Sequence, residues 1–302
     1  MVNAGVLVEM NSFTRTRLLA RSVSASLLRR FGVTVDVPIG RIAQTKGSMR
    51  DSICRALWTT GRWQPPIEDL LELSFHNSPE GVFLDVGANV GHFSVLATHF
   101  GASHVIAIEA LPELCTKIES IASELSLPIK TVSAMVGPPH MRASILRGPD
   151  SNIGGTQVRE TDSSTSESSK TVTLSSLVQK SVRHDIAFIK IDIEGLELFA
   201  LESIAEWIQN QETHLPPIVF EWTPKFATNL SLDYSQVFSA FLQYGYQSYS
   251  LPPASYDGGN PMGKSWQGLL RVNVLPNFRS DILLAHPQRS EVLLEFLEDL
   301  LA

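Results

Sequence analysis

Short runs rich in apolar residues alternate with helical patterns along the middle of this 302-residue chain. Such runs occupy 82–86, 104–109, 129–134, 186–192 and 218–222. The segments between them repeat apolar residues at intervals of three and four, which is the spacing of one helix face. Strands that alternate with helices form a parallel sheet covered on both faces. The pattern therefore predicts one large α/β domain, with helices at 90–99, 112–127 and 196–209.

The pattern is less regular in two places. Residues 142–147 can form a strand, but 148–170 combines turn residues with Ser, Thr and acids, which cannot bury enough apolar area to become ordered. We therefore expect a flexible insertion at 148–170. A second segment, 252–277, is rich in Pro and Gly and predicts an irregular loop. The other expected elements are a helix at 234–244, strands at 246–251 and 281–285, and an amphipathic C-terminal helix at 290–302.

The first 50 residues differ in composition from the rest of the chain. Residues 1–60 contain nine Lys or Arg and three acids, a net charge of +6, whereas the whole chain carries −7. Residues 1–50 are rich in Arg and Ser and carry leucines at partly helical spacing, which is typical of a mitochondrial or plastid transit peptide. The alternative is a basic helix that packs on the domain. After it we expect a helical lead-in at 51–80, where Pro65 and Pro66 can start a helix.

Composition argues against several classes of protein. The negative net charge disfavours a general nucleic-acid binder. Cys54 and Cys115 have no paired spacing, so we predict neither a disulfide framework nor a cysteine metal site. No run of about 18 uncharged apolar residues occurs, so we expect no transmembrane helix. We expect a cytoplasmic protein, or a mitochondrial or plastid one if residues 1–50 are a transit peptide, and the oligomeric state stays open.

The stretch from Gly81 to Ser94 has the pattern of a strand, a glycine turn and a helix start. Gly87 and Gly91 allow the backbone to pass close to a ligand, and the helix start offers unpaired N–H groups. Glu109 ends the next apolar run, 18 residues after Gly91. In a parallel sheet such an acid lies beside the first turn, where it can accept hydrogen bonds from ribose hydroxyls. Together the two features predict a nucleoside site.

A second group of charged residues surrounds the end of the apolar run at 186–192. Lys190 and Asp192 share one face of the predicted strand, and Glu194 follows at a turn. Charged groups at the carboxyl end of a buried strand are costly unless they are paired or used for function. The alternatives are a catalytic role or an internal ion pair with Lys190. Glu221, at the end of the next strand, is a second site acid or a buried partner of Lys190, and Glu197 is expected in the first turn of a helix.

Three stretches, in this order and spacing, resemble the FkbM family of S-adenosylmethionine-dependent methyltransferases. They are Phe83 to Ser94, Ile108-Glu109-Ala110, and Ile189 to Glu197. The resemblance covers about residues 60–290, with the methyltransferase domain at 81–290. It implies a class I methyltransferase fold, which is a Rossmann-like three-layer sandwich with a seven-stranded, mostly parallel sheet and an antiparallel last strand.

The resemblance also implies roles for individual residues, with S-adenosyl-L-methionine as the cofactor. Glu109 would bind the ribose, and Ser133 and Ala134 would border the adenine. Asp192 and Glu194 would face the methyl group and the acceptor. The methionine portion of the cofactor would be lined by Asp85, Gly87, Asn89 and Gly91. One departure is Ser175, because the family usually has an acid after the Thr-Leu pair that precedes it.

Methyl transfer to an alcohol needs donor and acceptor in line and a general base. We expect Glu194 or Asp192 to take the proton, with Glu221 or His92 as the next candidates. The expected acceptor is a hydroxyl group of a small molecule or glycan, and no metal-ligand set with diagnostic spacing occurs. One alternative is a nicotinamide-dependent oxidoreductase, which Asn89 disfavours because it replaces the middle glycine of the dinucleotide motif. Another is a non-catalytic cofactor-binding assembly module.

Overall fold

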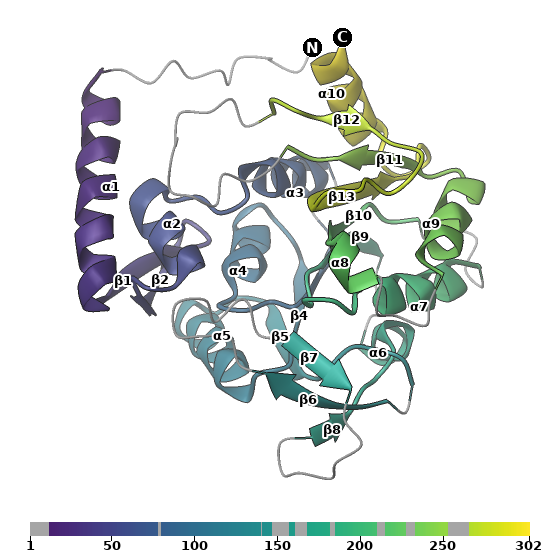
Figure 1. Ribbon diagram of the computed structural model, residues 1–302, viewed down its shortest axis with the longest axis horizontal. Helices are drawn as coiled ribbons and strands as arrows, with labels where there is room; N and C mark the ends of the chain where they lie inside the picture. The colour runs from purple at the N-terminus through teal and green to yellow at the C-terminus, as the bar shows by residue number, and fades with distance from the viewer. Residues whose placement is uncertain are drawn as a thin grey trace.

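The computed structural model describes residues 12–77, 80–139, 141–146, 157–160, 168–181, 185–209, 215–227, 233–252 and 266–302. Its centre is a mixed sheet with helices on both faces (Figure 1). The strand order is β12-β11-β13-β10-β9-β3-β4-β5. The bounds are β3 Val82–Val86, β4 His104–Glu109, β5 Ile129–Ser133, β9 Ile186–Ile191, β10 Ile218–Trp222, β11 Gln247–Ser250, β12 Leu270–Arg271 and β13 Ser280–Ala285.

The strands of the sheet agree closely with those predicted from the sequence. Strands β5, β4, β3, β9 and β10 are parallel, and β13 lies between β10 and β11, antiparallel to both. Strand β13, the last strand along the chain, is therefore antiparallel, as expected. One correction concerns the number of strands: the two-residue strand β12 pairs with β11 and makes eight instead of seven. It lies in 252–277, a segment expected to be an irregular loop.

Alternate residues of each central strand face opposite layers of helices. In β3, Phe83 packs with one layer, formed by α3, α4 and α10, whereas Leu84 and Val86 pack with α6, α7 and α9. Helix α5 packs on α4's side of the sheet, where Ile118 meets Ala107. The bounds are α3 Pro65–Asn77, α4 His92–His99, α5 Pro112–Leu125, α6 Leu174–Ser181, α7 Glu197–Gln209, α8 Pro224–Ala227, α9 Tyr234–Gln243 and α10 Glu291–Leu301.

The N-terminal part contains a β-hairpin that the sequence pattern did not predict. Helix α1 (Ser12–Phe31) precedes strands β1 (Thr34–Ile39) and β2 (Ala43–Ser48), and helix α2 (Ser52–Thr60) follows. Val37 and Ile39 are fully buried in a cluster that includes residues of α4 and α5. The chain therefore packs continuously across the predicted boundary at residue 50. Val35, Val37 and Ile39 alternate as in a half-buried strand, but β2 is almost wholly polar, and the basic composition of residues 1–50 favoured a transit peptide or a helix.

The segment expected to be a flexible insertion contains ordered strands in the part that the structure describes. Strand β6 (Arg142–Leu146) pairs with β7 (Gln157–Glu160) and β8 (Ser168–Lys170) in an antiparallel sheet. The sequence pattern predicted no strands at 157–160 and 168–170, where backbone pairing with β6 forms them, and the flexibility of 148–170 stays a prediction. The rest of 148–170 lies outside the described residues.

Candidate functional site

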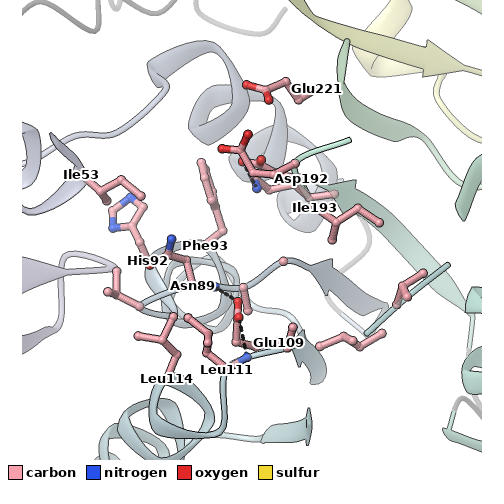
Figure 2. Close-up of a pocket in the computed structure, with 18 of the residues that line it drawn as sticks. Ile53, Asn89, His92, Phe93, Glu109, Leu111, Leu114, Asp192, Ile193 and Glu221 are labelled. Atoms are coloured by element: carbon pink, nitrogen blue, oxygen red, sulfur yellow. Dashed lines mark hydrogen bonds and ion pairs between the residues drawn. The ribbon is translucent and has the colours of Figure 1, made fainter. Parts of the chain in front are cut away.

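A cavity of about 290 Å³ opens at the carboxyl ends of β3, β4, β9 and β10 (Figure 2). Ligands of open parallel sheets bind at this edge. Most of the residues singled out in the sequence line it: Gly87, Asn89, Glu109, Ala134, Lys190, Asp192, Glu194, Glu221 and His92. Asp85 and Gly91 are not among the lining residues. The structure therefore brings the glycine turn and the second charged group together in one cavity.

The turn after β3 requires glycine for two separate reasons. Gly87 has a φ of +82°, and a Cβ there would lie 1.8 Å from the backbone oxygen of Asp192. The turn thus passes directly against the end of β9. Asn89 also has a positive φ, +51°, a conformation that asparagine tolerates better than most residues. Gly91 precedes α4 with a φ of +82°, where a Cβ would meet Ile118.

Glu109 is held at the cavity wall by two backbone groups. Its carboxylate accepts hydrogen bonds from the N–H of Asn89, at 2.8 Å, and from the N–H of Leu111, at 3.0 Å (Figure 2). Burial raises the pKa of Glu109, and these hydrogen bonds oppose the rise. A carboxylate has about four lone-pair sites, so acceptor capacity remains for a ligand. Ala134, on the same side of the cavity, follows β5 directly.

Asp85 lies beneath the turn and does not line the cavity. It is almost fully buried, and the Ser94 hydroxyl donates to its Oδ2 at 2.6 Å. Its Oδ1 is buried and accepts no hydrogen bond from any described residue. Burial raises the pKa of Asp85, while the charge of Lys190 acts in the opposite direction. Asp85 therefore connects the start of α4 with the charged end of β9.

The acids after β9 and β10 form a cluster in which each has a different environment. One carboxylate oxygen from each of Asp192, Glu194 and Glu221 lies within 4.8 Å of the others. Lys190 donates to Asp192 at 3.1 Å, so the internal ion pair considered from the sequence is present. Glu221 is paired with Arg279 instead of Lys190, through Nε at 2.9 Å and also through Nη2.

Glu194 differs from its two neighbours. Its side chain makes no hydrogen bond or ion pair with the described residues, and its backbone has a positive φ of +50°. Burial and the nearby carboxylates of Asp192 and Glu221 raise the pKa of Glu194 to about 8. Non-glycine residues with such backbone angles are concentrated at functional sites. Glu194 therefore has an accessible carboxyl group that titrates near neutral pH.

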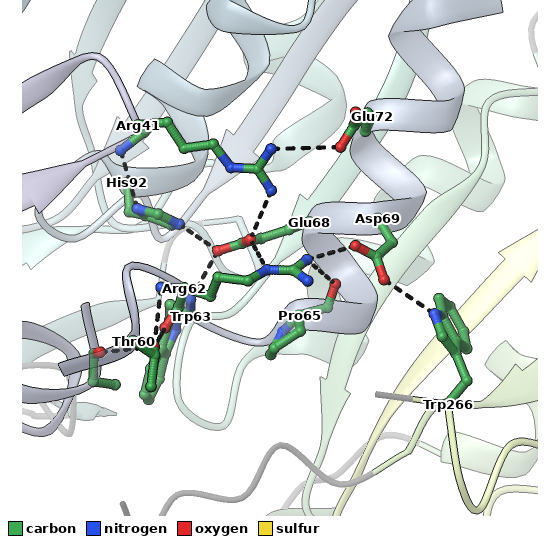
Figure 3. Close-up of polar contacts among 12 residues, drawn as sticks. Arg41, Thr60, Arg62, Trp63, Pro65, Glu68, Asp69, Glu72, His92 and Trp266 are labelled. Atoms are coloured by element: carbon green, nitrogen blue, oxygen red, sulfur yellow. Dashed lines mark hydrogen bonds and ion pairs between the residues drawn. The ribbon is translucent and has the colours of Figure 1, made fainter. Parts of the chain in front are cut away.

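His92 does not have a free ring nitrogen (Figure 3). The N–H of Gly40 donates to its Nδ1 at 3.2 Å, so Nε2 carries the proton and donates to Glu68 at 2.9 Å. Glu68 is fully buried and also accepts from Arg62 at 2.6 Å and from the N–H of Trp63 at 2.8 Å. Burial favours a higher pKa for Glu68, but the contacts with His92 and Arg62 outweigh it and lower the pKa. This network joins the hairpin tip to α3 and α4.

Glu197 occupies the first turn of α7, as predicted. Its carboxylate accepts from the N–H of Ile193 at 3.1 Å and from the N–H of Gly195 at 3.0 Å. Burial is the main reason that the pKa of Glu197 is raised to about 8. Its position stabilises the loop that carries Glu194.

Several lining residues could not be found from motifs. Ser52 and Ile53 reach the cavity from α2, and Trp63 and Gln64 reach it from the connection to α3. They come from the N-terminal part, which has no recognisable motif. Arg279 lies just before β13 and reaches Glu221 because β13 pairs with β10. The sequence contains no local signal for this contact.

The topology and the site together define the class of this protein. A parallel sheet whose antiparallel last strand is inserted beside β10, with a glycine turn and the acid Glu109 at its carboxyl edge, is a class I methyltransferase fold. The family model described as the methyltransferase FkbM domain matches residues 85–248, more than half of the chain. The chain belongs to the FkbM methyltransferase family, which confirms the resemblance noted in the sequence.

Solved structures with a similar arrangement include three methyltransferases. The first is precorrin-6Y C5,15-methyltransferase from Geobacter metallireducens, with 10% identity over 73% of this chain and 88% of that chain and a TM-score of 0.37. The second is an rRNA methylase from Streptococcus thermophilus, with 10% identity over 74% of this chain and 98% of that chain and a TM-score of 0.38. The third is the ribosomal protein L11 methylase from Lactobacillus delbrueckii, with 13% identity over 75% of this chain and 80% of that chain and a TM-score of 0.34. No curated protein matches the sequence significantly. No helix in the described part of the chain is long and apolar enough to cross a membrane.

Proposed function

We propose that this protein uses S-adenosyl-L-methionine to methylate a hydroxyl group of a small molecule or sugar. The observation that supports this most is the position of the acid cluster, which shares one cavity with the glycine turn and Glu109. The residues of the turn would hold the methyl donor, and the acids of the cluster would bind the acceptor in the same cavity. The family assignment supports methyl transfer, and the acids support a hydroxyl acceptor.

The residues at the turn are suited to hold the cofactor. Glu109 would accept hydrogen bonds from the ribose hydroxyls with the lone pairs that Asn89 and Leu111 leave free. Ala134 would border the adenine ring. Gly87 would let the backbone approach the methionine portion. The buried Oδ1 of Asp85, which accepts no hydrogen bond from a described residue, would favour the positively charged end of the cofactor.

Glu194 is the best candidate for the general base. Asp192 is ion-paired with Lys190 and Glu221 with Arg279, so both carboxylates are already engaged by a cationic side chain. His92 has both ring nitrogens engaged. Glu194 makes no hydrogen bond or ion pair with a described residue. Burial raises its pKa, the nearby charge of Arg279 opposes part of the rise, and the resulting value of about 8 suits a base that works near neutral pH.

The proposed reaction divides the work among these residues. When bound, the cofactor supplies an electrophilic methyl group on a sulfonium sulfur. Asp192 and Glu221, held in place by Lys190 and Arg279, would accept hydrogen bonds from acceptor hydroxyls and align one of them. Glu194 would remove the proton of that hydroxyl as its oxygen forms the new bond to carbon and the carbon–sulfur bond breaks. Ile53 and Trp63 would exclude water from the cavity.

The test compares Glu194→Gln with Glu124→Gln, which makes the same change at an exposed position on α5. Each variant would be incubated with methyl-labelled cofactor and fractionated polar metabolites or glycans. We expect Glu194→Gln to lower turnover about 10²-fold or more, while the Kd for S-adenosylhomocysteine measured by calorimetry stays nearly unchanged. Unchanged turnover would refute the role of Glu194. Binding of NADH in place of S-adenosylhomocysteine would refute the proposed cofactor and favour the oxidoreductase.

A further inference from the structure

The outward face of α1 carries large apolar side chains that no other described element covers. Val23, Leu27 and Phe31 are 72%, 62% and 70% exposed. They are spaced four residues apart, so they lie in one stripe along the helix. Figure 1 shows α1 at the edge of the molecule, beside α2. Single exposed apolar residues are ordinary, but an aligned set on one helix indicates an interaction surface.

The opposite face of α1 holds the helix against α2. Ala25 is buried, and Arg21 donates to the backbone oxygen of Trp58 at 3.3 Å and stacks over its ring at 5.7 Å. At about 100° per residue, Arg21 and Ala25 point roughly away from the stripe. The contact with α2 therefore orients the stripe outward.

The charge of α1 indicates what the stripe contacts. Residues 12–31 contain five Arg and no acid, so the helix carries +5 while the rest of the chain carries −12. Arg30 is exposed three residues after Leu27 and flanks the stripe, whereas Arg29 lies four residues after Ala25, on the side of the helix toward α2. A helix with an apolar stripe and a basic flank is suited to the surface of an anionic bilayer, where apolar side chains enter the interface and arginines meet phosphates.

We propose that the stripe formed by Val23, Leu27 and Phe31, together with Arg30, docks the protein on an anionic lipid surface. The helix lies parallel to the surface, because its arginines prevent it from spanning the bilayer. This arrangement places the rest of the molecule, which has the opposite net charge, away from the lipid headgroups. The surface is separate from the cavity and does not depend on the proposed reaction.

The experiment is a vesicle sedimentation assay with the full chain. Vesicles of phosphatidylcholine would be compared with vesicles that contain roughly one quarter phosphatidylserine. We expect binding only to the anionic vesicles, weakened by salt. Leu27→Asp should reduce the partition constant about tenfold or more. Arg30→Gln should reduce it about fivefold, because a basic residue near an anionic surface contributes on the order of 1 kcal/mol.

Leu125→Asp is the matched control, because Leu125 is also exposed (40%) but lies at the end of α5. It should bind anionic vesicles like the unchanged protein, and thermal unfolding should show that Leu27→Asp is folded. Equal binding to neutral vesicles, absence of binding, or undiminished binding by Leu27→Asp would overturn the proposal. A lipid-free dimer that Leu27→Asp dissociates would also overturn it, because the stripe would then belong to a second copy of the chain.

Discussion

Replacing Gly87 by Ala tests the close contact between the turn after β3 and the end of β9. The added Cβ would lie 1.8 Å from the Asp192 oxygen, whereas Cβ atoms essentially never approach closer than 3.0 Å. The two segments must therefore separate by roughly 1.2 Å at a site where the Asp192 N–H also donates to the Val86 oxygen at 2.9 Å. A displacement of about 1 Å at a reacting site can lower turnover about 10²-fold.

The free energy of unfolding can be estimated from two contributions. A positive φ costs a residue with a Cβ about 1–2 kcal/mol, and the overpacked contact costs about 1–3 kcal/mol more. Gly61→Ala is the matched control, because Gly61 has a similar φ of +77° with no atom within 4 Å of the added Cβ. We expect Gly61→Ala to lower the free energy of unfolding only by the cost of the positive φ, and Gly87→Ala to lower it by about 2–5 kcal/mol in total.

Urea unfolding measures the difference in the free energy of unfolding between the two variants. Calorimetry with S-adenosylhomocysteine measures how each substitution changes ligand binding in the cavity. Gly87→Ala should lose most of its affinity for the ligand, whereas Gly61→Ala should keep it. Equal stability of the two variants together with unchanged affinity in Gly87→Ala would show that the turn does not press against β9 as described.

Three further predictions concern titrating groups. The pKa of Glu194 is about 8, and a base must be deprotonated, so kcat/KM should rise with pH to a plateau above that value, and Glu194→Gln should remove this rise. Glu197 has a folded-state pKa of about 8 against an ordinary value of 4.5. Its contribution to stability is thus present below pH 4.5 and is lost as pH rises through 8. The free energy of unfolding in urea should therefore decline less between these pH values in Glu197→Gln than in the unchanged protein. Glu68 has a lowered pKa in the folded protein. Its contribution to the free energy of unfolding is therefore present above the pKa of the unfolded state and is lost as pH falls through the pKa of the folded state. Glu68→Gln should therefore lose about 3–5 kcal/mol at neutral pH and less in acid; an equal loss at both pH values would contradict this reasoning.

The sequence alone was sufficient for the central sheet and the main motifs. Each core strand is a short apolar run, and each motif lies where such a run ends, so local spacing was enough to place Gly87, Glu109 and Asp192 at one edge of a parallel sheet. The β1–β2 hairpin and the two strands within 148–170 were not predicted. Their order comes from backbone pairing with distant or polar segments, which apolar spacing does not reveal.

The tertiary structure decided how the acids of the site differ from one another. The sequence identified Asp192, Glu194 and Glu221 as candidates but could not separate their roles. Arg279 reaches Glu221 from 58 residues away through the pairing of β13 with β10, and Gly40 engages His92 from 52 residues away. A pKa depends on burial and on charges within a few ångströms, whatever their distance along the chain. Local spacing can therefore bring carboxyl groups to the cavity, but only the packed chain leaves Glu194 as the one of the three that makes no ion pair with a described residue.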